Sequence, residues 1–163
     1  MDWNLAGNRV RYRFQVKIIS CQTQIILYGR LSENILFMLQ TNTLATLGSI
    51  SFQNNPSVSM LNISSLLTIP NGLYINNCNL LTNIIWPSNV SSLYANSPYA
   101  LDCSSNSLSS SEINEILALY VSLGNYGPSN MNISFQNPPA PPIGQGINDV
   151  NTLMSIGVNV TTD

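Results

Sequence analysis

Apolar residues return at short spacings through the middle of this 163-residue chain, against a background rich in Asn and Ser. The segment 44–55 has the pattern LxxLxxIxFxxN, the segment 73–84 has LxIxxCxxLxxI, and the segment 101–108 reads LDCSSNSL. A shorter version of the motif begins at Leu93. Recurrence of one motif predicts an internal repeat, and a repeat limits the possible folds more than any other feature of this sequence.

The stretch LDCSSNSL resembles the LxLxxNxL core of leucine-rich repeats. The segment 66–93, in which Pro follows the apolar runs, is similar to the irregular repeats of bacterial (Bacteroidetes-type) surface leucine-rich proteins. The segment 137–163 resembles the endings of such repeats in bacteriophage and Bacteroidetes-type proteins. The resemblance implies a β-rich α/β fold, a short and irregular parallel solenoid whose turns of about 20–29 residues each add one strand. An unrelated β-sandwich with Asn-rich turns is the alternative.

The resemblance also implies what each motif position does. The first, third and sixth positions would point inward, and the Asn at the sixth position would bond backbone groups, because its side chain both donates and accepts. The segment 137–163 would act as the C-terminal cap that a solenoid needs to cover its open end.

The N-terminal region has a different pattern. In the run 9–19 the odd positions from 9 to 17 are polar or basic and the even positions from 10 to 18 are apolar, which predicts a strand with two unlike faces. The run 23–31 predicts a second strand that forms an antiparallel hairpin with the first, and 33–39 is either a strand or a short helix. We therefore divide the chain into a basic β-region for anchoring or assembly, 1–42, and a leucine-rich-repeat-like domain with its cap, 43–163.

The basic residues lie only at the beginning of the chain, because no Lys or Arg follows Arg30. Arg9, Arg11, Arg13 and Lys17 share one face of the first predicted strand, and we predict that this face docks an acidic protein partner. A solvated face, or a strand edge protected by charge, is the alternative. Nucleic acid is not the expected partner, since four charges make a small footprint and the pI is about 4.8.

The C-terminal half predicts two helices. Helical spacing of apolar residues over 113–123, with Ser110 or Ser111 as N-cap and Gly124 at the end, predicts the first. A strand over 131–135, a polyproline-type connector over 137–146, a short helix over 147–156 and a final strand over 157–163 are expected to follow.

The residue types argue against an enzyme. The chain has no His, the commonest general base and metal ligand. Cys21, Cys78 and Cys103 lie far apart without CxxC spacing, which predicts buried free thiols, no metal site and no cofactor. Glu112 and Glu115 fit a solvated helix start. A glycan hydrolase, whose two carboxylates can come from distant positions, remains a third hypothesis.

We predict a non-enzymatic virion structural protein of a bacteriophage, a spike, fibre or capsid-associated decoration, located in the virion. Its partners would be other virion proteins or a second copy of itself, as a homo-oligomer, and a host-surface glycan or protein. The candidate ligand-facing aromatics are Tyr74, Trp86, Tyr94 and Tyr99. The alternative is a cellular leucine-rich-repeat protein-binding module, in the bacterial cytoplasm or at the cell surface. We expect neither a classical signal peptide nor a transmembrane segment, because the apolar runs are too short.

Overall fold

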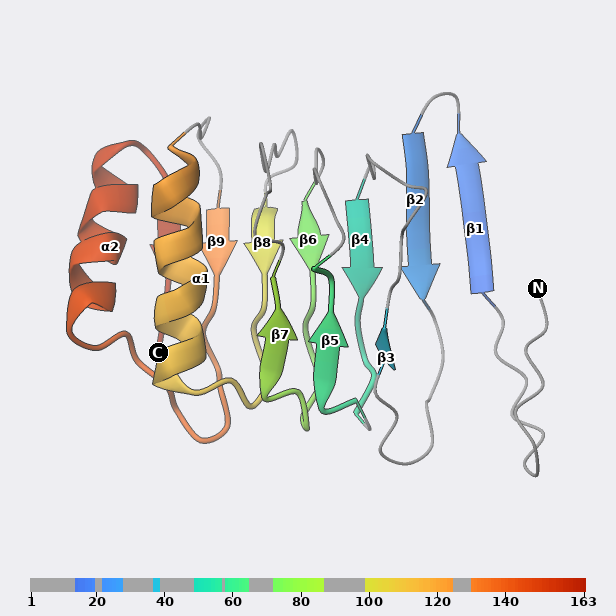
Figure 1. The fold of residues 1–163 in the computed structure, drawn as a ribbon, viewed down its shortest axis with the longest axis horizontal. Helices are drawn as coiled ribbons and strands as arrows, with labels where there is room; N and C mark the ends of the chain where they lie inside the picture. Colours follow the sequence, from blue (N-terminus) through green and yellow to red (C-terminus); the bar gives the residue numbers. More distant parts are fainter. Residues whose placement is uncertain are drawn as a thin grey trace.

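The computed structural model describes residues 14–19, 22–27, 37–38, 49–56, 58–64, 72–86, 99–124 and 130–163. Side chains are described for 52–56, 58–64, 72–86, 101–124 and 130–163. These residues form a mixed α/β fold with two sheets and two helices (Figure 1).

The larger sheet has seven strands in the order β1-β2-β4-β6-β8-β9-β10. From β2 to β10 every neighbouring pair is parallel, whereas β1 pairs antiparallel with β2. Figure 1 shows these strands side by side along the molecule. Their bounds are Phe14–Ile19 for β1, Gln22–Leu27 for β2, Ser49–Phe52 for β4, Leu73–Tyr74 for β6, Tyr99–Asp102 for β8, Asn130–Asn132 for β9 and Asn159–Thr161 for β10.

The smaller sheet consists of β3 (Phe37–Met38), β5 (Met60–Asn62) and β7 (Asn83–Ile85), which pair in parallel in that order. From β2 to β8 the chain alternates between the two sheets. After β8 the alternating element is a helix instead, first α1 (Ser110–Leu123) and then α2 (Gln145–Ser155). Figure 1 places both helices in the layer that contains β5 and β7.

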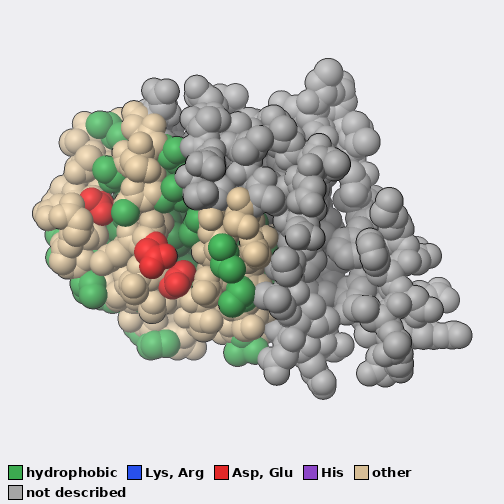
Figure 2. Space-filling model, viewed as in Figure 1, with side chains coloured by type: hydrophobic (Ala, Val, Ile, Leu, Met, Phe, Trp, Pro, Cys, Tyr) green, Lys and Arg blue, Asp and Glu red, His purple; other side chains and the backbone are tan. Residues whose placement is uncertain are grey.

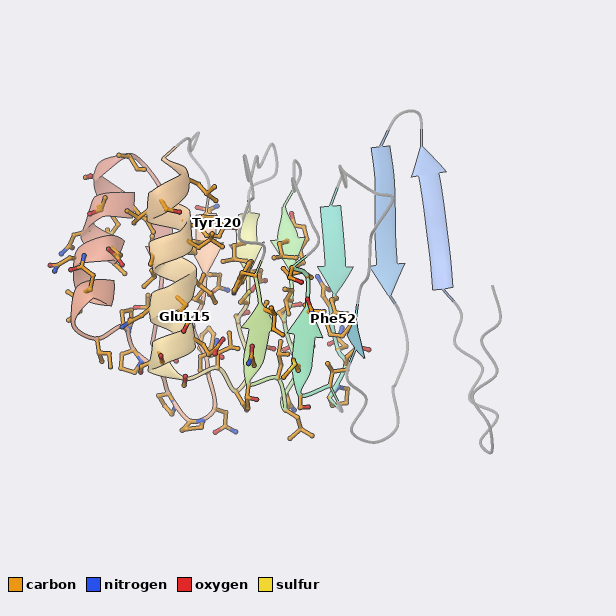
Figure 3. The ribbon with its side chains drawn as sticks, in the orientation of Figure 1. Phe52, Glu115 and Tyr120 are labelled. Carbon is orange, nitrogen blue, oxygen red and sulfur yellow. The ribbon has the colours of Figure 1, made fainter. Side chains whose placement is uncertain are left out.

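The core lies between these two layers. Ile50, Leu73, Leu101 and Met131 occupy the same register position on successive parallel strands, and the last three are completely buried. The residues two positions after Leu73, Leu101 and Met131 are also completely buried; they are Ile75, Cys103 and Ile133. Figure 3 shows Phe52, next to the small sheet, and Tyr120, on α1, at opposite sides of the described core.

The sixth motif position is buried as well, at Asn106 (1% exposed). The predicted inward orientation of the first, third and sixth positions is therefore confirmed in the segment 101–108, where Leu101 and Cys103 are the other two. Leu73 pairs with Leu101 across the sheet, so the segment 101–108 lies next to β6 in the large sheet. The motif that begins at Leu93 lies outside the described residues.

The predicted helix at 113–123 is confirmed, with one correction at its start. Ser109, not Ser110 or Ser111, is the N-cap: its backbone is extended and its side chain accepts a hydrogen bond from the amide of Glu112 at 3.3 Å. An N-cap side chain accepts from the amide of the second or third helical residue, and here it is the third, Glu112. Gly124 ends the helix with φ 62°, as predicted.

The strands and the helix predicted after Gly124 are found close to their expected positions. The strand at 131–135 is β9, the helix at 147–156 is α2, and the last strand is β10. The residues that would join β1 and β2 in a hairpin, Ser20 and Cys21, lie outside the described residues. β2, from the predicted anchor region, lies next to β4 in the large sheet, and the division at 42 remains a prediction.

Candidate functional site: the polar face of the large sheet

The outer face of the large sheet carries a row of polar side chains. Tyr74, Asp102, Asn132 and Thr161 are register partners on β6, β8, β9 and β10. Tyr74, Asp102 and Asn132 each lie between two completely buried positions, so their side chains point away from the core, and Thr161 shares their register. Tyr74, Asp102 and Asn132 are half-buried and Thr161 is exposed. We call these four residues the polar row.

Hydrogen bonds fix the carboxylate at the centre of the row. Oδ1 of Asp102 accepts from the amide and the hydroxyl of Ser104, at 3.1 and 2.6 Å. Oδ2 accepts from Nδ2 of Asn76, on the preceding strand segment, at 3.1 Å. A carboxylate that holds three donors has a defined orientation.

The same local geometry returns one strand later. Oδ1 of Asn132 accepts from the amide of Ser134 at 3.3 Å and from its hydroxyl at 2.7 Å. This bond leaves Nδ2 of Asn132 as a donor on the outer face. The polar row therefore combines an aromatic ring, a carboxylate, an amide and a hydroxyl on parallel strands, which lie about 4.8 Å apart.

A second row of side chains, at the sixth motif position, connects consecutive strands beneath the surface. We call Cys78, Asn106 and Gln136 the ladder residues. Nδ2 of Asn106 donates to the carbonyl of Ile75 at 2.7 Å, and Nε2 of Gln136 donates to the carbonyl of Cys103 at 2.9 Å. Sγ of Cys78 lies 3.8 Å from the carbonyl oxygen of Phe52. Each ladder residue thus reaches the backbone carbonyl at the third motif position of the preceding segment in the large sheet.

The backbone also repeats immediately before each ladder residue. Asn77, Ser105 and Phe135 have φ angles of 57–58°, as does Asn54 in the preceding unit. The amide of Asn77 donates to the carbonyl of Ser104, and the amide of Ser105 donates to the carbonyl of Ser134. Asn tolerates this left-handed conformation better than a large aromatic residue does. Phe135 adopts it nonetheless, with its side chain 73% exposed.

Asp163 takes over the acceptor role for the unit that contains β9. Its carboxylate accepts from the amides of Phe135, Gln136 (3.1 Å) and Ala140 (2.9 Å). In the earlier units the equivalent amides bond to the unit that follows, as Ser105 does to Ser134 and Cys78 does to Oδ1 of Asn106. The carboxylate of Asp163 therefore takes the place of both a backbone carbonyl and a side-chain oxygen, which are the acceptors of the equivalent amides in the earlier segments.

The thiols and acids of the described region fit a structural role. Cys78 and Cys103 are buried and free, as predicted, and Cys21 lies outside the described residues. Burial raises the pKa of the Cys78 thiol from 9.0 to about 11. Burial, and then the negative charge of Asp102, raises the pKa of Cys103 well above its usual value.

Glu112 and Glu115 lie in different environments, although both are near the start of α1. Glu115 is exposed, as expected for a solvated helix start. Glu112 is half-buried, and its Oε2 accepts from the amide of Ile84 on β7 at 3.5 Å, at the edge of the small sheet. Burial is the main cause that raises the pKa of Glu112 above 4.5. On the face shown in Figure 2, acidic side chains occupy only small areas of the described surface.

The predicted site residues fall in different places. Tyr74 is in the polar row. Trp86 follows β7 on the other layer, is half-buried and packs against the core, so it does not join Tyr74. Tyr99 begins β8 and pairs with Asn130, and Lys17 lies in β1. Arg9, Arg11, Arg13 and Tyr94 lie outside the described residues.

The sequence interpretation missed Asp102, Asn132 and Thr161. For Asp102 and Asn132 the available signal was a position between two apolar residues, which must face away from the core once the segment is placed on a strand. Thr161 has an apolar neighbour on one side only and carried no such signal.

No group of three or more His, Cys, Asp or Glu in the described ranges could hold a metal ion. No helix among these residues is both long and apolar enough to cross a bilayer. Comparisons with family models, with curated proteins and with solved structures also found no match.

Proposed function

We propose that this chain is a leucine-rich-repeat-type parallel solenoid that serves as a non-enzymatic binding module, with the polar row as its contact surface. The observation that supports it best is the exact register of Tyr74, Asp102, Asn132 and Thr161 on four strands. The ladder residues support the repeat assignment, because each one bonds the equivalent carbonyl of its predecessor.

We infer a surface glycan as the partner. An aromatic ring beside amide, hydroxyl and carboxylate groups suits a sugar, which presents an apolar ring face and many hydroxyls. The described part of the row has no Lys or Arg, so it offers nothing that would favour a polyanion. The half-buried state of Tyr74 and Asp102 holds these groups in place before binding, which lowers the entropy cost of association.

A glycan array probed with the full chain, followed by calorimetry on any hit, tests this proposal. Tyr74→Ala and Asn132→Leu should each weaken binding by about tenfold or more, because binding energy concentrates in a few central contacts. Thr82→Ala, next to β7 on the other layer, is the matched control and should bind normally. Binding that survives both polar-row variants, or no binding to any glycan, would contradict the proposal.

We further propose a bacteriophage virion as the setting, with the N-terminal region as the anchor. The observation that favours it is the position of all five basic residues within 9–30. Charge reversal of Arg9, Arg11 and Arg13 to Glu should remove the chain from purified particles, whereas Asp102→Asn should not. If the triple variant is recovered with particles in the usual amount, the basic residues belong to a solvated strand face instead.

A further inference from the structure

The end of the described structure formed by α2 and β10 carries an unusual concentration of exposed apolar side chains. Ile147 and Met154, seven residues apart on α2, are 53% and 54% exposed. Ile143 before the helix and Ile156 after it are 54% and 44% exposed. Among the described residues, these four are most of the large apolar side chains in contact with solvent. Monomeric proteins seldom expose such a patch without a partner.

The orientation of α2 explains which way this patch faces. Gly146, Asp149 and Leu153 are the buried residues of the helix, and an added Cβ at Gly146 would meet the side chain of Asn114 on α1. This row therefore faces α1 and the core. At 3.6 residues per turn, Ile147 and Met154 lie about 100° from Gly146 and Leu153, so they are outside this buried row and exposed to solvent.

A free strand edge lies at the same end. β10 pairs with β9, and no other described strand pairs with β10 on its opposite side. Such edges are usually protected by charged residues or Pro. Here α2 and β10 contain one charged residue, Asp149, which is 6% exposed and accepts from Nε2 of Gln145 at 3.0 Å. We call β10 with Ile143, Ile147, Met154 and Ile156 the end surface.

We propose that the end surface joins two copies of this chain in a two-fold symmetric dimer, with β10 pairing antiparallel to its equivalent and α2 packing on α2. A two-fold interface requires a surface that complements itself. The end surface meets this requirement because it has exposed apolar side chains on α2 and no charged residue in β10, so two copies meet without like-charge repulsion, and because one open strand edge satisfies another.

The other end of the sheet does not fit as the partner. It is formed by β1, which runs antiparallel to its neighbour and contains Lys17. Within the described ranges the two helices occur only near β9 and β10 (Figure 1). A head-to-tail contact would leave Ile147 and Met154 without an apolar helix to pack against, whereas the symmetric contact gives each α2 an identical helix.

Light scattering of the full chain, from low to high micromolar concentration, tests the dimer. The expected mass at high concentration is twice the chain mass of 17.8 kDa. Ile147→Lys combined with Met154→Lys should weaken dimerisation by about tenfold or more, because it places charge at the centre of an apolar interface. Thr161→Lys, an exposed edge substitution, should weaken it through the strand pair.

Leu80→Lys is the matched control, since Leu80 is also exposed (51%) but precedes β7, and this variant should dimerise normally. Urea unfolding of each variant verifies that the monomer fold is retained. A wild-type chain that stays monomeric at the highest concentration would overturn the proposal. An oligomer that neither the α2 variant nor Thr161→Lys weakens would overturn it as well. Neither result depends on whether the polar row binds a glycan.

Discussion

The side chain of Asn106 connects its own segment, 101–106, with the segment 75–78, which is distant in the sequence. Its Nδ2 donates to the carbonyls of Ile75 (2.7 Å) and Cys103 (2.9 Å), and its Oδ1 accepts from the amide of Cys78 at 2.9 Å. Asn106 is 1% exposed, so water cannot replace these bonds. One amide side chain therefore satisfies backbone groups that the turn between the layers would otherwise leave unpaired.

Asn106→Leu should destabilise the fold strongly. The substitution keeps the side-chain size but leaves two buried carbonyls with fewer donors and one buried amide with no acceptor. We expect a loss of about 2–5 kcal/mol in the free energy of unfolding, since an unsatisfied buried polar group costs about 1–3 kcal/mol. Urea unfolding measures it, with Asn79→Leu, at an exposed turn position, as the control. Equal midpoints for the two variants would contradict the structural role of Asn106.

Cys78 should make stability depend on pH in the alkaline range. Its folded-state pKa, about 11, lies above the unfolded value of 9.0 because burial disfavours the thiolate. The folded state therefore binds its proton more tightly, and stability should fall as pH rises from about 9 to about 11. Cys78→Ala should reduce this fall, measured by urea unfolding at several pH values. If the free energy of unfolding of Cys78→Ala fell with pH as steeply as that of the natural chain, this prediction would be wrong.

Cys78 and Cys103 should also react slowly with thiol reagents, since the thiolate is the nucleophile and both thiols are buried. Labelling of the native chain at neutral pH should modify these two residues much more slowly than labelling in denaturant. Peptide mass spectrometry assigns each site, and rapid native labelling of either residue would show that it is accessible.

Glu112 should destabilise the fold when it ionises. Burial raises its pKa above 4.5 in the folded state, so its contribution to stability is present below that pH and is lost as pH rises through the raised pKa. Glu112→Gln keeps an acceptor for the amide of Ile84 without the charge. The variant should be as stable as the natural chain at neutral pH, or more stable, with a smaller pH dependence.

The matched control is Glu115→Gln, three residues further along the same helix. Glu115 is exposed, and its charge is the last of the causes that act on the pKa of Glu112. The control should therefore keep most of the acid-range pH dependence, measured by thermal unfolding between about pH 4 and 7. Identical profiles for the two variants would argue against a special environment at Glu112.

Asp163 should hold the segment after β9 in place. Asp163→Ala removes a charged acceptor from three backbone amides, and hydrogen bonds to charged groups contribute about 1.5–3 kcal/mol. We expect a comparable loss of stability, together with faster hydrogen exchange at Phe135, Gln136 and Ala140. Thr162→Ala, at the neighbouring position, is the control. Unchanged exchange at these three amides in Asp163→Ala would contradict the capping role.

The sequence by itself determined the local structure of the C-terminal half. The spacing of Ile113, Ile116 and Tyr120 specifies one apolar helix face, and Gly124 supplies the left-handed residue that ends the helix. The LxLxxN pattern at Leu101, like any alternation on a strand, specifies which side chains enter the core. These features depend on neighbours within a few residues, so the sequence contains them in full.

Only the tertiary structure decided which units stand side by side and what they present. Leu73 pairs with Leu101 although 28 residues separate them, and no local pattern encodes which of two distant strands become neighbours in the sheet. The long-range partners of Asp102, Asn106 and Asp163 are 23–31 residues distant, as in the bond from Asn76 to Asp102, that from Asn106 to Ile75 and that from Ala140 to Asp163. The sequence alone does not show whether a polar residue is buried or faces outward. Only the contacts across strands distinguish a ladder residue from a member of the polar row.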